Sequence, residues 1–217
     1  MVMRADNTMN KALFGLLIVS MLLGSGGCGE NAARLNDRAR KAFMAGDQAE
    51  AVSLFGRVLE LDPDNVDAHL YLGWIYSMQG KVDEAMAEFK KVITAKPDFG
   101  LAHQNLGDML LEKGMLVEAI AAFKRAIAIN PDAGMAYYGL GIAYKRQAAL
   151  TEAGDAFFEA GLIAVVVNNK ELAVNAYTNL KETGNTQLAV ELQGVLSPWF
   201  DPANDVVTPP HGGRSQQ

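Results

Sequence analysis

Two histidines, His69 and His103, stand 34 residues apart and are the first side chains to test as metal ligands. A zinc ion needs both ring nitrogens at about 2 Å. Equivalent positions on neighbouring packed helices lie about 8–10 Å apart, which is too far for two rings to share one ion. We therefore expect both histidines to have a structural role, and we predict no metal site.

The carboxylates do not form a recognisable catalytic set. Asp83, Glu84 and Glu88 have helical spacing, which indicates a solvated helix face. The sequence has no glycine-rich nucleotide loop, no H-E-x-x-H motif and no G-x-S-x-G motif. We predict no catalytic residue, no cofactor and no enzymatic activity.

The overall composition excludes further classes of function. Nineteen basic residues against 25 acidic ones give a net charge of −6, so we predict no nucleic-acid partner. Half of the residues are hydrophobic and only 8 % are aromatic, which favours an all-helical protein over a sheet protein. Cys28 is the single cysteine, so an intrachain disulfide and a cysteine-based zinc site are both excluded.

The N-terminal residues have the pattern of an export signal. Arg4 and Lys11 precede an uncharged apolar run over residues 12–23, followed by small residues and then Cys28. The run is shorter than the roughly 20 residues that span a bilayer, but it suits the core of a signal peptide. A lone cysteine at this place resembles a bacterial lipoprotein signal, although Ser25 stands where that pattern has leucine.

The lipoprotein resemblance implies a signal peptide over residues 1–27, with Cys28 lipidated as the first mature residue. The protein would then be anchored in a bacterial membrane on its periplasmic side. Gly29 favours the outer membrane over the inner one. The alternative is ordinary cleavage near residues 25–27, which would release a soluble exported protein.

The rest of the chain repeats with a period of 34 residues. The recurring residues are Pro63, Pro97 and Pro131; Ala51, Ala85, Ala119 and Ala153; Phe55, Phe89, Phe123 and Phe157; and Gly73, Gly107 and Gly141. Four units follow, at residues 32–65, 66–99, 100–133 and 134–167, and each contains two amphipathic stretches. The small residues allow two helices to approach closely, and phenylalanine fills the adjoining space.

The proline near the end of each unit stops the second helix, because it has no N–H to donate. We expect the aspartates that follow, Asp64, Asp98 and Asp132, to start the next helix.

The motif of the second unit, Leu72-Gly73, Tyr76, Ala85, Phe89 and Pro97, resembles the tetratricopeptide repeat. The resemblance implies an all-α fold, a right-handed α-solenoid of stacked antiparallel helix pairs whose first helices line a concave groove. Residues 170–197 fit a degenerate fifth repeat that caps the stack, with Gly184 at its turn. The tail at residues 198–217 is expected to be disordered.

In this family, particular positions of each first helix face the groove. The residues of this sequence at those positions that we predict to bind a partner are Leu70, Tyr71, Trp74, Met78, Gln104, Asn105, Asp108, Tyr138, Ile142 and Lys145. Large apolar residues among polar ones are typical of partner sites, because tryptophan and tyrosine are frequent hot spots.

The main hypothesis is an envelope scaffold or adaptor that binds a partner polypeptide in this groove. By resemblance, lipoproteins of this architecture assist secretin or pilus assembly or act as adaptors for envelope enzymes. The alternative is a small-ligand binder or enzyme that uses the concave face as a cleft, for which Asp108, Glu112, Lys145 and Arg146 offer the polar groups. A homo-oligomer joined through terminal units stays open.

Overall fold

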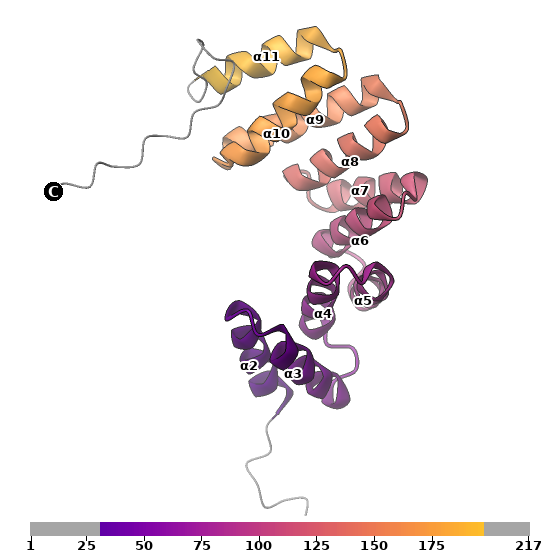
Figure 1. Ribbon diagram of the computed structural model, residues 1–217, viewed down its shortest axis with the longest axis vertical. Helices are drawn as coiled ribbons and strands as arrows, with labels where there is room; N and C mark the ends of the chain where they lie inside the picture. Colours follow the sequence, from indigo (N-terminus) through magenta and orange to yellow (C-terminus); the bar gives the residue numbers. More distant parts are fainter. Residues whose placement is uncertain (1–30, 198–217) are drawn as a thin grey trace, which may run out of the picture. The chain divides into compact units, whose positions relative to one another are not determined.

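The computed structural model describes residues 31–197, which contain ten α-helices and no strand (Figure 1). The predicted signal peptide, Cys28 and the tail at 198–217 lie outside the described residues. Contact clustering divides the chain after Asp62 into two compact units. The first unit contains α2 (Ala32–Met44) and α3 (Gln48–Leu61). The second contains α4 (Val66–Met78), α5 (Val82–Ala95), α6 (Gly100–Glu112), α7 (Leu116–Ile129), α8 (Gly134–Arg146), α9 (Leu150–Val166), α10 (Lys170–Glu182) and α11 (Thr186–Leu196).

The first unit is one helix pair. The side chain of Asn31 accepts a hydrogen bond from the backbone N–H of Arg34, and Asp47 does the same for Glu50. Each bond satisfies an N–H that the first turn of a helix leaves without a partner. Ala39 and Phe55 are fully buried at the positions where the other pairs have glycine and phenylalanine.

The second unit is a stack of helix pairs. Each helix packs mainly against its neighbours in the chain, and α8 also contacts α6 and α10, the first helices of the adjacent pairs. The first helices α6, α8 and α10 therefore lie next to one another along the stack. This arrangement is the α-solenoid of antiparallel helix pairs that the repeat predicts.

A glycine and a phenylalanine hold each central pair together. A Cβ atom added to Gly73 would lie 2.5 Å from the ring of Phe89, and one added to Gly107 would lie 2.7 Å from Phe123. The same contact, at 2.6 Å, recurs between Gly141 and its partner in α9. Any side chain at these glycines would overlap the ring. The small-against-large match predicted from the period is thus the contact that fixes the distance between the two helices.

The turn inside each pair needs a left-handed residue. Gly80 and Gly114 have φ values of +69° and +74° at this place. Ala148 occupies the same place in the fourth pair with φ +63°, a conformation that costs a residue with a Cβ about 1–2 kcal/mol. Each turn is closed by a hydrogen bond, such as that from the N–H of Lys81 to the carbonyl of Tyr76, 2.9 Å long.

The predicted start of the first helices was wrong at the level of single residues. Asp64 does not cap α4. The side chain of Asn65 accepts the hydrogen bond from the N–H of Ala68, at 3.0 Å. The helices α6 and α8 have Phe99 and Ala133 at this position and no side-chain cap. Each aspartate lies in the preceding turn, one residue before the N-cap, which is too early to reach a free N–H of the first helical turn.

The last two pairs pack differently from the others. The helix α9 has 17 residues, and it contacts both α10 and α11. A Cβ added to Gly161 would lie 2.6 Å from Leu192 of α11, and one added to Gly154 would lie 3.2 Å from the hydroxyl of Thr183. These two glycines lie outside the 34-residue pattern, and they allow α9 to approach the final pair closely. None of the ten helices combines the length and apolarity needed to cross a membrane.

Candidate protein-binding face

The residues predicted to meet a partner come from the first helices of three consecutive pairs in the second unit. We call this surface the first-helix face. Its members are Tyr71, Trp74 and Met78 of α4, Gln104, Asn105 and Asp108 of α6, and Tyr138, Ile142 and Lys145 of α8. Trp74, Asp108 and Ile142 are equivalent residues, each 34 positions from the next. Since α6 and α8 are in contact, their side chains belong to one continuous surface.

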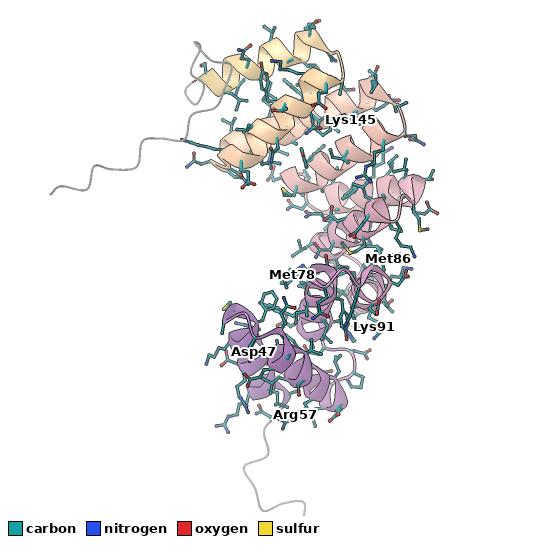
Figure 2. All side chains as sticks on the ribbon, viewed as in Figure 1. Asp47, Arg57, Met78, Met86, Lys91 and Lys145 are labelled. Atoms are coloured by element: carbon teal, nitrogen blue, oxygen red, sulfur yellow. The ribbon has the colours of Figure 1, made fainter. Side chains whose placement is uncertain are left out.

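The helix α4 supplies the aromatic part of this face. The rings of Tyr71 and Trp74 meet edge to face, with centroids 5.0 Å apart and planes at 82°. Both side chains are half-buried, whereas Met78 is 57 % exposed at the end of the helix (Figure 2). Leu70 departs from the prediction, because it is only 5 % exposed and packs in the core, where it offers a partner almost no surface.

The helix α6 supplies the polar part. Gln104, Asn105 and Asp108 are all partly buried. The amide nitrogen Nδ2 of Asn105 is inaccessible to solvent and has no hydrogen-bond partner. Burial raises the pKa of Asp108 to about 7, because the charged carboxylate loses water that no other group replaces. This helix therefore presents a donor and a carboxyl group whose bonding capacity is not used.

The helix α8 is tied to α10 by hydrogen bonds. The hydroxyl of Tyr138 accepts a bond from Nδ2 of Asn179, 3.1 Å away, and its ring lies 5.6 Å from that of Phe157. Lys145 donates to Oδ1 of Asn179 at 2.9 Å and forms an ion pair with Glu182 (Figure 2). Tyr138 and Lys145 therefore have structural bonds, in addition to the surface that they expose.

Asn179 and Glu182 are the site residues that the sequence reasoning missed. Asn179 stands 34 positions after Lys145, so the repeat period itself carried the signal. The fifth unit is degenerate, and the only role predicted for its first helix is to cap the stack. Arg146 also has a partner, since it donates to the carbonyl of Leu111 at 2.9 Å, one of the last carbonyls of α6. Cations are stabilised at a helix C-terminus in this way.

The two histidines lie away from the first-helix face and have the structural role expected of them. His69 is 4 % exposed, and its Nε2 donates to the carbonyl of Pro63 at 2.8 Å. Its Nδ1 lies 2.5 Å from Glu88, which also accepts a bond from Lys91 at 2.9 Å. The prediction that Glu88 belongs to a solvated face was wrong, because its side chain is 12 % exposed and holds the imidazole.

His103 shares one hydrogen bond with His69 but lacks the other. His103 also bonds through Nε2 to a proline carbonyl, that of Pro97, at 2.9 Å. Ala122 stands 34 positions after Glu88, so this histidine has no carboxylate beside it at the equivalent place. Among residues 31–197, no three histidine, cysteine or acidic side chains come close enough together to hold a metal ion.

Three cavities lie elsewhere on the described surface. One is beside His69, lined by Pro63, Lys91 and Thr94 among others; a second lies between α8 and α9, and a third between α10 and α11. None of the ten predicted residues lines any of these three cavities. The first-helix face takes its residues from several helices, an extent that suits a polypeptide.

Family models agree with this fold. One model described as a tetratricopeptide repeat matches residues 42–106, and a second TPR model continues over residues 107–147. Residues 42–147 therefore match the tetratricopeptide-repeat family. The matched part includes all of α4 to α8, and with them all nine residues of the first-helix face. No curated protein matches the sequence.

Solved structures with tetratricopeptide folds resemble the chain over most of its length. A crystal structure of MamA is 26 % identical, covers 80 % of this chain and 97 % of its own, and superposes with a TM-score of 0.62. PilF of Pseudomonas aeruginosa is 17 % identical, with 78 % and 77 % coverage and a TM-score of 0.64. YrrB, described as a TPR protein with an unusual peptide-binding site, is 21 % identical, with 77 % and 94 % coverage and a TM-score of 0.55.

Proposed function

We propose that this protein is a non-enzymatic scaffold of the bacterial cell envelope that binds a segment of a partner polypeptide on its first-helix face. The observation that carries the proposal is the composition of that face. It combines the half-buried aromatic side chains of α4 with hydrogen-bonding groups of α6 that have no partner among residues 31–197. Each of these residues remains partly exposed. Aromatic residues beside unsatisfied polar groups are typical of protein interfaces.

Two further points support the proposal. YrrB, which shares the fold, is described as having a peptide-binding site. The N-terminal residues have the charge, apolar run and cysteine expected of an exported lipoprotein. The acidic net charge of −6 would not hold the protein on an anionic lipid surface, so the anchor would be the acyl chains on Cys28.

The binding surface can be tested with substitutions at its aromatic end, in variants that keep the helical content of the wild type. We expect Trp74→Ala together with Met78→Ala to reduce capture of a partner from solubilised membranes by tenfold or more, because interface tryptophans contribute about 2 kcal/mol or more. The matched control is Val117→Ala, which removes an apolar side chain that is 67 % exposed on the second helix α7. Equal capture by both variants would reject the assignment of this face.

The anchor can be tested separately. Radiolabelled palmitate should enter the wild-type protein in bacterial cells and be absent from Cys28→Ala. Labelling of the variant, or a processed wild-type protein without label, would contradict lipidation and leave ordinary signal cleavage.

A further inference from the structure

Two polar groups of α6 lie on the first-helix face without partners among residues 31–197. The carboxyl group of Asp108 is partly buried and forms no hydrogen bond or ion pair there, and the buried Nδ2 of Asn105 has no acceptor. The two residues are three positions apart, so their side chains are neighbours on one side of the helix. A buried polar group without a partner costs about 1–3 kcal/mol, which a suitable ligand group recovers.

The two cations in the last turn of α8 are already engaged. Lys145 is held by Asn179 and by Glu182, and Arg146 donates to the carbonyl of Leu111. Neither cation therefore neutralises Asp108, and the raised pKa of this carboxyl has desolvation as its cause. Glu112, one turn further along α6, is exposed and adds a second negative charge. The charges that α6 adds to this face, on Asp108 and Glu112, are therefore negative.

The positions equivalent to Asp108 in the two neighbouring pairs are apolar. Trp74 and Ile142 are its equivalents in α4 and α8, and both are partly buried against the core. Lysine and arginine combine an apolar stem with a terminal cation. Such a side chain could pack its stem along this row, bring its charge to the carboxylate and use the tryptophan face for a cation–π contact.

We propose that the segment bound on the first-helix face places a lysine or arginine side chain against Asp108, with large apolar side chains beside it on Trp74 and Ile142. This inference rests on the proposed function and names the chemistry of the partner. The basic side chain supplies a positive charge for Asp108, which has no cationic partner among residues 31–197.

The experiment is a selection from a library of random peptides against the full-length protein in detergent micelles. We expect the selected peptides to share one lysine or arginine flanked by large apolar residues. Replacing that basic residue by norleucine should weaken binding at least tenfold to the wild type and less than twofold to Asp108→Asn. Such a difference isolates the pairwise interaction.

Two control variants separate the possible failures. Glu112→Gln removes a neighbouring exposed charge and should keep the tenfold effect, and Trp74→Ala reports whether a peptide uses the first-helix face at all. Selected peptides that need Trp74 but have no basic residue, or a norleucine effect that persists in Asp108→Asn, would overturn this inference alone. Peptides whose binding is indifferent to Trp74, or no selected peptide, would overturn the proposed function as well.

Discussion

Replacing Asp108 by asparagine should stabilise the protein at alkaline pH and have less effect at acidic pH. Burial raises the pKa of Asp108 from 3.8 to about 7, so the folded protein holds this proton more tightly than the unfolded chain does. Between these two values, stability falls as the pH rises, because the folded state must ionise a carboxyl that lacks water. Above pH 7 the whole penalty applies. An asparagine has nearly the same shape and carries no charge.

The size of the effect follows from the same two values. A difference of about three pKa units corresponds to roughly 4 kcal/mol, and partial exposure of the side chain reduces this to on the order of 2–4 kcal/mol. We therefore expect Asp108→Asn to be more stable than the wild type by this amount at pH 8 and by roughly 1.5 kcal/mol at pH 5, and the gain disappears only below the unfolded pKa of 3.8. Other groups titrate in both proteins, so they cancel in the difference.

The measurement is urea unfolding followed by circular dichroism at pH 5, 6, 7 and 8 for both proteins. Glu112→Gln is the matched control, since it removes an equal charge from an exposed position one turn away and should shift the unfolding free energy by less than about 0.5 kcal/mol at every pH. Parallel stability profiles for wild type and Asp108→Asn would refute the reasoning. So would an equal gain in the Glu112→Gln control.

Four other substitutions test the helix packing, the left-handed turn and the buried histidine. Gly107→Ala should destabilise the protein by about 1–3 kcal/mol in thermal unfolding, since its Cβ would meet a phenylalanine ring, whereas Gly56→Ala, with nothing within 4 Å, should stabilise it by up to about 1 kcal/mol. Ala148→Gly should raise the free energy of unfolding by about 1 kcal/mol, because glycine adopts the left-handed conformation without strain. An unchanged melting temperature would contradict the presence of strain at Ala148. Glu88→Ala should lower the free energy of unfolding by about 2–4 kcal/mol, because a buried imidazole nitrogen loses its partner. It should also sharply increase hydrogen exchange at the His69 ring. Retained exchange protection would exclude this role of Glu88.

The fold was predictable because its decisive contacts recur. One glycine beside one phenylalanine is weak information, but the same pair at Gly73, Gly107 and Gly141 gives both the helix pairing and the distance between the helices. The left-handed turn also recurs with this period, at Gly80, Gly114 and Ala148. A periodic pattern of this kind is retained along the chain because each repeat packs chiefly against the repeats next to it.

The departures from prediction lie where a single residue acts outside the pattern. Asn65 caps α4 although Asp64 precedes it, because one residue of backbone decides which side chain reaches a free N–H. Glu88 is buried because His69 lies opposite to it, and the equivalent Ala122 shows that the repeat does not require a carboxylate. Leu70 faces the core although its position is a groove position in the family.

The candidate site was predictable as a surface but not as a set of interactions. The repeat placed Trp74, Asp108 and Ile142 on equivalent positions of successive first helices. Whether a charge there is paired depends on the neighbours that reach it, and the sequence does not reveal that Lys145 turns to Glu182 rather than to Asp108.

The contact of α9 with both helices of the final pair limits how far the array is modular. A pair from the middle of the stack could in principle be duplicated or exchanged, because its interfaces are alike. The closing pair has no such equivalence: Leu192 and Thr183 fit against Gly161 and Gly154, which no other pair provides. Lengthening this protein by copying repeats would therefore have to insert them before α8, and the last two pairs would be inherited together as one terminal block.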